Sequence, residues 1–344
     1  PGCDGASADS SGSSRCQSGG RGSIRLKAAD DRGLSKGAPP VARINPVPGS
    51  FTAPDGSEIA IWRWPHRPGR PTLHWAHATG FHGRTYAPLL DALAEDCNVL
   101  AWDMRGHGAS AHAGALDRFR GWQSYYDDLC ALVESRDSPL WLAGHSIGAT
   151  VSIMAAARLP LRVQGLMLAE PVILERWQGM QLRAAKLLRQ SHRFGLAAGA
   201  ARRRPHFASR AEAKANYLGR GGFRSWPASW LDAYVEHGFV DDEPGVRLAC
   251  APSWESATFT HTEHNAWPGL RRLRCPVIAL GASQASTFAP AARQRMKALL
   301  PDTEVITVNN TTHFLPMECP EAVVDAIRRL VSSPDGLQKH DAKC

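Results

Sequence analysis

The chain lacks an apolar run long enough to cross a membrane. A membrane-spanning helix needs about 18 consecutive apolar residues. The longest apolar stretches, such as residues 163–172, instead have the length of a buried strand. The first 40 residues also lack the apolar core of a secretory signal and are rich in Gly, Ser, Ala, Arg and Asp. We therefore expect no stable membrane insertion and a disordered segment over residues 1–40.

The chain also lacks the cysteine and basic motifs of several protein classes. Its eight cysteines are scattered without a C-x-x-C pair, and most lie inside apolar patterns. This pattern favours a reducing cytoplasm over a disulfide scaffold. The formal net charge is +8, but no zinc-finger spacing, RNA-binding sheet motif or basic heptad arm accompanies it. We expect neither a nucleic-acid partner nor a metal or organic cofactor.

Strand and helix patterns alternate along most of the chain. A turn at Asp55-Gly56 separates two runs that predict a β-hairpin. Further strands are expected at residues 71–77, 98–108, 139–146, 163–172, 275–283 and 303–310. Helices are expected at residues 84–96, 122–136, 147–160, 290–301 and 317–331. Strands separated by single helices predict an α/β fold whose sheet is doubly wound and mostly parallel.

The alternation stops after Pro171 and resumes near residue 266. The intervening residues 172–265 predict helices and loops, with no clear strand. We therefore expect one α/β core, formed by residues 50–171 and 266–332, with a helical cap of residues 172–265 inserted after the sixth strand. Residues 333–344 are predicted to be a polar tail.

The segment Gly144-His145-Ser146-Ile147-Gly148 has the pattern G-x-S-x-G. It follows an apolar strand and opens a helix, which is the setting of a nucleophile elbow. The turn is so tight that the positions two before and two after the serine must be nearly free of side chain. Such a turn exposes the Ser146 hydroxyl and directs the Ile147 backbone N–H at a developing oxyanion.

His313 follows the last predicted strand. A loop there lies at the carboxyl end of the sheet, beside the elbow, so His313 can take the Ser146 proton and return it to a leaving group. The histidines of the insertion, His237, His261 and His264, fit this chain order less well.

Residues from about 50 to 332 resemble the α/β-hydrolase superfamily. The resemblance rests on the elbow, on the segment HATGFHGRTYAPLLDAL and on the segment DMRGHGAS. It implies a second oxyanion donor in the first of these segments. The implied donor is the backbone N–H of Phe81, and Thr79 is the alternative because the loop is longer than the usual His-Gly-Phe.

The resemblance also implies a catalytic carboxylate, commonly in the loop after the seventh strand. No Asp or Glu occurs here from Cys275 to Leu300. Glu170 ends the sixth strand, where haloalkane dehalogenases of the same superfamily place their acid, and we expect it to accept the His313 N–H. The alternatives are a neutral acceptor, Ser283, Gln284 or Ser286, or a Ser–His dyad.

These residues predict a serine hydrolase that cleaves a carboxylic ester or a related acyl compound through an acyl-enzyme. The expected partner is an apolar small-molecule acyl substrate, and the cap is expected to act as a lid over Ser146. Three alternatives remain: acyl transfer, hydrolysis of a C–C bond, and a ligand receptor without catalysis. Asp103 and Arg105 are expected to hold a structural turn.

Overall fold

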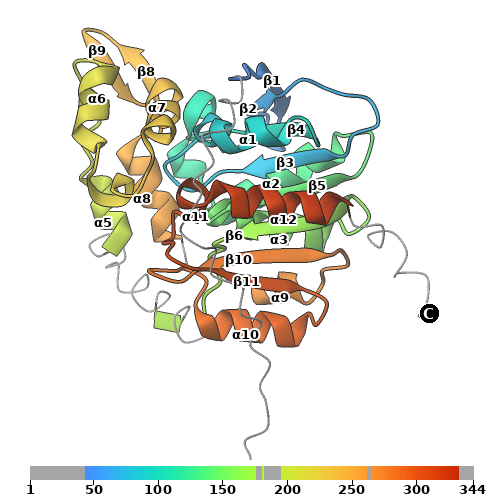
Figure 1. The fold of residues 1–344 in the computed structure, drawn as a ribbon. Coiled ribbons are helices and arrows are strands. Elements are labelled where there is room, and N and C mark those ends of the chain that lie inside the picture. The colour runs from blue at the N-terminus through green and yellow to red at the C-terminus, as the bar shows by residue number, and fades with distance from the viewer. Residues whose placement is uncertain (1–42, 176–179, 182–194, 262–264, 333–344) are drawn as a thin grey trace, which may run out of the picture. The chain divides into compact units, whose positions relative to one another are not determined.

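A computed structural model describes residues 43–175, 180–181, 195–261 and 265–332, and Figure 1 shows how their elements are arranged. The segments predicted to be disordered, residues 1–40, and to form a polar tail, residues 333–344, lie outside these ranges. The main sheet has eight strands in the order β1-β2-β4-β3-β5-β6-β10-β11. Their bounds are β1 Val47–Thr52, β2 Glu58–Arg63, β3 Thr72–Ala76, β4 Asn98–Trp102, β5 Leu140–His145, β6 Val163–Ala169, β10 Val277–Ala282 and β11 Glu304–Val308.

The direction of the strands follows from the connections between them. β1 and β2 pair antiparallel across the predicted turn, where Gly56 has a φ of 83°, a conformation that glycine adopts without strain. β2 also pairs antiparallel with β4. The remaining neighbours are parallel, because each is reached through a helical crossover. The mostly parallel sheet predicted from the sequence is confirmed.

Helices cover both faces of this sheet. Along β5, Leu140 and Leu142 pack into one hydrophobic cluster, whereas Trp141 and Ala143 pack into the other, as the alternation of side chains along a strand requires. The first cluster includes residues of α2 and α3, and the second includes residues of α1 and α12. The helices of this domain are α1 Ala87–Leu93, α2 Trp122–Glu134, α3 Ile147–Arg158, α9 Trp267–Leu270, α10 Pro290–Leu299, α11 Leu315–Glu318 and α12 Pro320–Ser332, with 3-10 turns η1 Gly83–Tyr86, η2 Gly108–Ser110 and η3 Leu116–Arg118.

The insertion after β6 contains strands as well as helices. Its described elements are α5 Gly195–Ala201, β7 His206–Phe207, α6 Arg210–Tyr217, η5 Gly221–Phe223, α7 Ala228–His237, β8 Phe239–Asp242, β9 Gly245–Leu248 and α8 Pro252–Thr260. β7, β9 and β8 form a separate three-stranded antiparallel sheet. The expectation that residues 172–265 hold no strand is therefore wrong. These strands have only two to four residues, which is too few to show a clear hydrophobic period.

Hydrogen bonds from α8 and α7 are among the contacts that join the insertion to the main domain. From α8, the Thr258 carbonyl oxygen accepts the indole N–H of Trp122 at 3.0 Å, and Trp254 donates to the Tyr125 hydroxyl at 3.1 Å. α7 packs against η1, where His82 Nε2 donates to the Tyr234 carbonyl oxygen at 3.1 Å. Within the described ranges, none of the helices is long and apolar enough to span a membrane.

Candidate active site

Ser146 lies at the turn between β5 and α3. Its φ is 57° and its ψ is −121°, a conformation that side-chain-bearing residues rarely adopt. The flanking glycines permit the turn. A Cβ on Gly144 would lie 2.6 Å from the backbone carbon of Gly148, and one on Gly148 would lie 2.2 Å from the Ala76 carbonyl oxygen. Both positions therefore exclude any side chain, as the elbow pattern predicts.

The structure brings Ser146, His313 and Glu170 together. His313 Nε2 is 3.1 Å from Ser146 Oγ, and His313 Nδ1 is 3.2 Å from Glu170 Oε2. Both distances lie at the upper end of hydrogen-bond reach for a nucleophile and its base. The three residues come from the ends of β5, β6 and β11, so the parallel sheet delivers them to one edge. A proton can thus pass from Ser146 to an imidazole whose other nitrogen faces a carboxylate.

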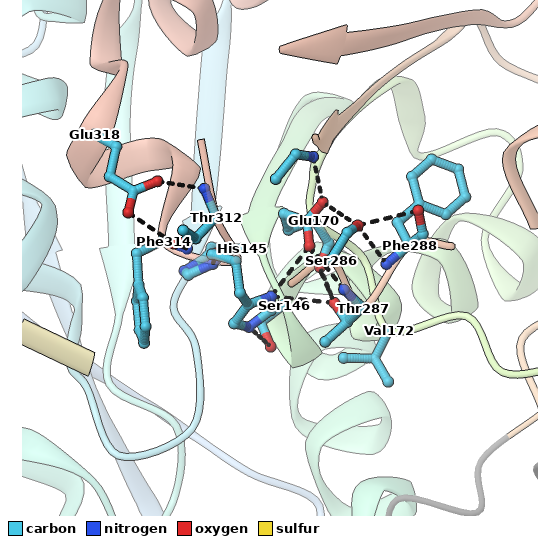
Figure 2. Close-up of polar contacts among 12 residues, drawn as sticks. His145, Ser146, Glu170, Val172, Ser286, Thr287, Phe288, Thr312, Phe314 and Glu318 are labelled. Carbon is cyan, nitrogen blue, oxygen red and sulfur yellow. Dashed lines mark hydrogen bonds and ion pairs between the residues drawn. The ribbon is translucent and has the colours of Figure 1, made fainter. Parts of the chain in front are cut away.

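The Glu170 carboxylate is fully buried, and Figure 2 shows the hydrogen bonds that it accepts. Oε1 accepts the Ala282 N–H at 2.5 Å and the Ser286 hydroxyl at 2.6 Å, and Oε2 accepts the Thr287 N–H at 2.9 Å. Burial alone would raise the pKa of Glu170. The bonds from His313, Ser286 and the Ala282 amide outweigh burial and lower this pKa below its ordinary value. Glu170 therefore remains a carboxylate at neutral pH.

The loop after β10 contributes to the site without supplying an acid. Thr287 Oγ1 lies 3.1 Å from His313 Nδ1, so the Nδ1–H can be shared between Thr287 and Glu170. Ser286, one of the predicted neutral acceptors, contacts Glu170 instead of His313. Within the described residues, the side chains of Ser283 and Gln284 make no hydrogen bond to His313. Sequence reasoning missed Thr287, because a threonine in a polar loop carries no signal of its own.

The loop between β3 and η1 is the predicted source of an oxyanion donor. The Phe81 N–H already donates to the Ala78 carbonyl oxygen at 3.2 Å, in a turn that Gly80 allows with a φ of 78°. This bond weighs against Phe81, because an oxyanion donor must have its N–H available to the substrate. Among the residues described, none accepts the N–H of Thr79 or of Ile147, and both residues line the same cavity as Ser146.

A buried hydrogen-bond chain connects three loops of the site. The Tyr86 hydroxyl accepts the Ala78 N–H at 3.2 Å and donates to His145 Nδ1, which is 2.7 Å away. His145 Nε2 then donates to the His313 carbonyl oxygen at 2.7 Å. Burial, with the nearby His313, holds the pKa of His145 well below its ordinary value, so its imidazole is neutral and has one donor and one acceptor nitrogen. No motif in the amino-acid sequence indicates this hydrogen-bond chain.

A cavity of about 550 Å³ opens over Ser146 and His313. Its wall is mainly apolar and includes Phe81, Trp122, Ile147, Val172, Leu174, Leu196, Phe223, Phe259 and Phe314. Several of these belong to the insertion, which therefore lines the cavity that contains Ser146. Two charged side chains of the insertion, Arg203 and Glu255, also reach it. The cavity has the size and polarity of a site for a small, largely apolar ligand.

The charged residues after β4 hold a turn and lie outside this cavity. Asp103 accepts the Gly83 N–H at 2.7 Å and the Ala109 N–H at 2.8 Å. Arg105 donates to both carboxylate oxygens of Asp128, each at 2.6 Å. In the part of the chain that the structure describes, no group of three or more His, Cys, Asp or Glu side chains is arranged to hold a metal ion.

Comparisons with known proteins identify a family and several relatives of this chain. The model of a family described as "Alpha/beta hydrolase family" matches residues 68–326. The 2-(acetamidomethylene)succinate hydrolase of Mesorhizobium japonicum is 22% identical over 267 residues, covering 76% of this chain and 88% of that protein. Monoglyceride lipase of Rattus norvegicus is 32% identical over 144 residues, covering 39% of this chain and 47% of the lipase.

Solved structures show the same fold. The crystal structure of E-2-(acetamidomethylene)succinate hydrolase superposes with a TM-score of 0.71 at 20% identity, covering 83% of this chain and 99% of that one. A thioesterase domain from the curacin biosynthetic pathway superposes with a TM-score of 0.65 at 19% identity, covering 82% and 98%.

Proposed function

Because the chain belongs to the alpha/beta hydrolase family, we propose that it is a serine hydrolase that cleaves a carboxylic ester or a related acyl compound through an acyl-enzyme. One observation carries the proposal. Ser146 Oγ, the His313 imidazole and the Glu170 carboxylate follow one another at 3.1 and 3.2 Å, and Ser146 faces an apolar cavity. This is the order of nucleophile, general base and orienting acid that acyl transfer requires.

The roles of the three side chains follow from their contacts. Ser146 Oγ attacks the carbonyl carbon of the substrate while His313 Nε2 takes the hydroxyl proton. Glu170 stays ionised, holds Nδ1–H and stabilises the imidazolium that forms. Nε2–H then protonates the leaving group, which departs and leaves the acyl group on Ser146. A water molecule, deprotonated by His313, attacks the acyl-enzyme and releases the acid.

We propose that the backbone N–H groups of Ile147 and Thr79 donate hydrogen bonds to the oxyanion. Ile147 is the first residue of α3, so its N–H has no partner within the helix and adds to the positive end of the helix dipole. The engaged N–H of Phe81 makes Thr79 the better second donor. Two preorganised donors stabilise the tetrahedral intermediate more than the ground-state carbonyl, and this difference accelerates the reaction.

The apolar wall supports an acyl group with a hydrocarbon part as the substrate. The names of two relatives refer to different compounds, a monoglyceride and 2-(acetamidomethylene)succinate. They therefore support a class of reaction and do not point to one substrate. The insertion forms part of the wall, and we propose that it helps to select the acyl group. We also propose a cytoplasmic location, since the five described cysteines are free thiols.

A panel of p-nitrophenyl esters from acetate to decanoate tests the reaction. The wild-type protein should hydrolyse them with a burst of p-nitrophenol, and Ser146→Ala should reduce the rate by several orders of magnitude. Ser283→Ala, which removes an exposed serine at the end of β10, is the matched control and should retain activity. A Ser146→Ala rate above about 1% of the wild-type rate would place the nucleophile elsewhere.

The same assay separates the alternatives. Adding glycerol or another alcohol should leave the free acid as the main product, whereas an acyltransferase would form the new ester instead. A ligand receptor without catalysis would bind the esters and turn none of them over. Cleavage of a β-diketone in place of the esters would indicate hydrolysis of a C–C bond.

A further inference from the structure

An ion pair from the insertion lies in the wall of the mainly apolar cavity. Arg203, which follows α5, donates from Nη1 to Glu255 Oε2 at 2.5 Å, and Glu255 lies on α8. The second guanidinium nitrogen donates to the hydroxyls of Tyr217 at 3.1 Å and Tyr234 at 2.8 Å. The side chain of Arg203 is 19% exposed and that of Glu255 is 9% exposed. Three helices of the insertion, α6, α7 and α8, together with the segment after α5, therefore hold the pair in place.

The two carboxylate oxygens of Glu255 differ in their hydrogen bonds, because Oε2 accepts from Arg203 and Oε1 does not. Within the described residues no group donates a hydrogen bond to Oε1. Oε1 lies close to Gly80, where a Cβ would lie only 2.7 Å from Oε1 and 3.5 Å from Arg203 Nη1. Gly80 follows Thr79, whose backbone N–H is the proposed second donor to the oxyanion. Glu255 is therefore a mostly buried side chain whose Oε1 lies close to Gly80, beside the place where the scissile carbonyl would bind.

The charge balance of the pair selects the group that fits. A mostly buried carboxylate is stabilised by each hydrogen bond that it accepts, so a ligand that donates to Oε1 gains affinity. A carboxylate of the ligand would be repelled by Oε1, and an ammonium would be repelled by Arg203. A neutral donor meets neither repulsion, because the pair as a whole carries no net charge.

We propose that Glu255 Oε1 binds a neutral hydrogen-bond donor, a hydroxyl or an amide N–H, that the substrate carries close to its scissile carbonyl. The proposal rests on the function proposed above and narrows its substrate class. The preferred substrate would then be an acyl compound with an apolar part and one such donor, on either the acyl side or the alcohol side.

Matched substrates test both sides without altering the protein. On the acyl side, the p-nitrophenyl esters of N-acetylglycine, levulinic acid and succinic acid share one length and present an N–H, a CH₂ and a carboxylate. On the alcohol side, 2-hydroxyethyl hexanoate and propyl hexanoate differ only in a hydroxyl and a methyl group. On one side at least, the donor should raise kcat/KM about tenfold or more over the CH₂ or methyl analogue. The succinyl ester should be the poorest of its set.

Glu255→Gln provides a test that a purely structural ion pair would not pass. Arg203 requires an acceptor, so the amide oxygen should turn toward Arg203 and the NH₂ group toward the cavity. The cavity would then offer a donor and an uncompensated positive charge. The variant should lose the preference for the N–H or hydroxyl substrate and should prefer the succinyl ester to the N-acetylglycyl ester. Glu134→Gln, which removes an exposed carboxylate on α2, should keep the wild-type order.

The outcomes are distinguishable. Two results would overturn the proposed role of Glu255 and leave the hydrolase proposal standing. In the first, the wild-type protein turns over the whole set with no preference for a donor on either side. In the second, it prefers the succinyl ester. Turnover of none of these esters, together with no reaction of Ser146 with a fluorophosphonate, would overturn the proposed function itself. If Glu255→Gln fails to fold by circular dichroism, the wild-type comparison still decides.

Discussion

Two residues of the site have backbone conformations that side-chain-bearing residues rarely adopt. Ser146 has a φ of 57° and Glu170 a φ of 48°, both in the left-handed region that favours glycine. Each is held there by the sheet, since Ser146 N donates to the Ala169 carbonyl oxygen at 3.0 Å and Glu170 N donates to that of Leu280 at 2.8 Å. Such conformations persist only where surrounding bonds impose them, and they direct both side chains toward His313.

Replacing Glu170 by Gln should lower kcat by roughly 10²–10⁴-fold and change KM little. The amide removes the negative charge that stabilises the imidazolium, and this charge matters most in the transition state. Gln284→Ala is a matched control from the neighbouring loop and should keep nearly full activity. Steady-state kinetics on one p-nitrophenyl ester measure both variants. A Glu170→Gln enzyme with wild-type kcat and only a lower melting temperature would make Glu170 a structural residue.

The sequence indicated some of these residues but not others. Ser146 follows from a motif in a strand–turn–helix context, and the chain order points to His313 and Glu170. Thr287 and Glu255 carry no such signal, because their neighbours in space lie far away in the sequence. The choice of Thr79 over Phe81 as oxyanion donor also required coordinates, because it depends on which backbone N–H is already hydrogen-bonded within the turn.

At the scale of elements, the site depends on three loops that lie far apart in the sequence. The chain from Ala78 through Tyr86 and His145 to His313 joins the oxyanion loop, the elbow and the loop after β11. The two bonds of the Tyr86 hydroxyl are buried and the bond to His313 is partly buried, and unsatisfied partners are costly in such places. Tyr86 therefore acts as a positioning residue for the groups that touch the substrate.

Tyr86→Phe removes two of these bonds and should lower kcat about 10- to 100-fold with little change in KM. Tyr125→Phe is the matched control. Its hydroxyl is also buried and bonded twice, to Thr258 and Trp254, but it lies at the contact between α2 and α8. Both variants should lose about 1–3 kcal/mol of stability, yet only Tyr86→Phe should lose kcat. Equal loss of kcat in the two variants would assign Tyr86 a purely structural role.

The core elements could be predicted from periodicity, whereas the insertion could not. The strands of the main sheet have five to seven residues and lie between amphipathic helices, so their period is visible. β8 and β9 have four residues each. The Pro244-Gly245 turn between them was the available signal, and the surrounding Arg-rich and aromatic segments obscured it.

At the scale of the whole molecule, several histidines are completely buried as neutral imidazoles. Burial lowers the pKa of His74 to about 3 and those of His82 and His107 to about 4. It also holds the pKa values of His77 and His145 well below the ordinary value. In the unfolded chain all five would titrate near 6.5. Protons taken up below that pH therefore favour the unfolded state.

The free energy of unfolding should consequently decrease as pH falls from about 6.5 toward 4. Each histidine contributes up to about 1.4 kcal/mol per pH unit once its unfolded form is protonated. The buried Asp91, Asp103 and Asp128 have raised pKa values and act in the opposite direction, but only as they take up protons themselves. Urea unfolding at pH 7.5, 6.5 and 5.5 measures the effect. A midpoint that is constant or rises toward pH 5.5 would contradict it.

The central claim concerns the chemistry of Ser146. The most direct measurement is reaction of the intact protein with a fluorophosphonate, followed by digestion and mass spectrometry of the modified peptide. The label should lie on Ser146, should be absent in Ser146→Ala and should form much more slowly in Glu170→Gln, because the serine is activated only through His313. A label on another residue, or a Ser146 that stays unmodified in a folded protein, would contradict the account.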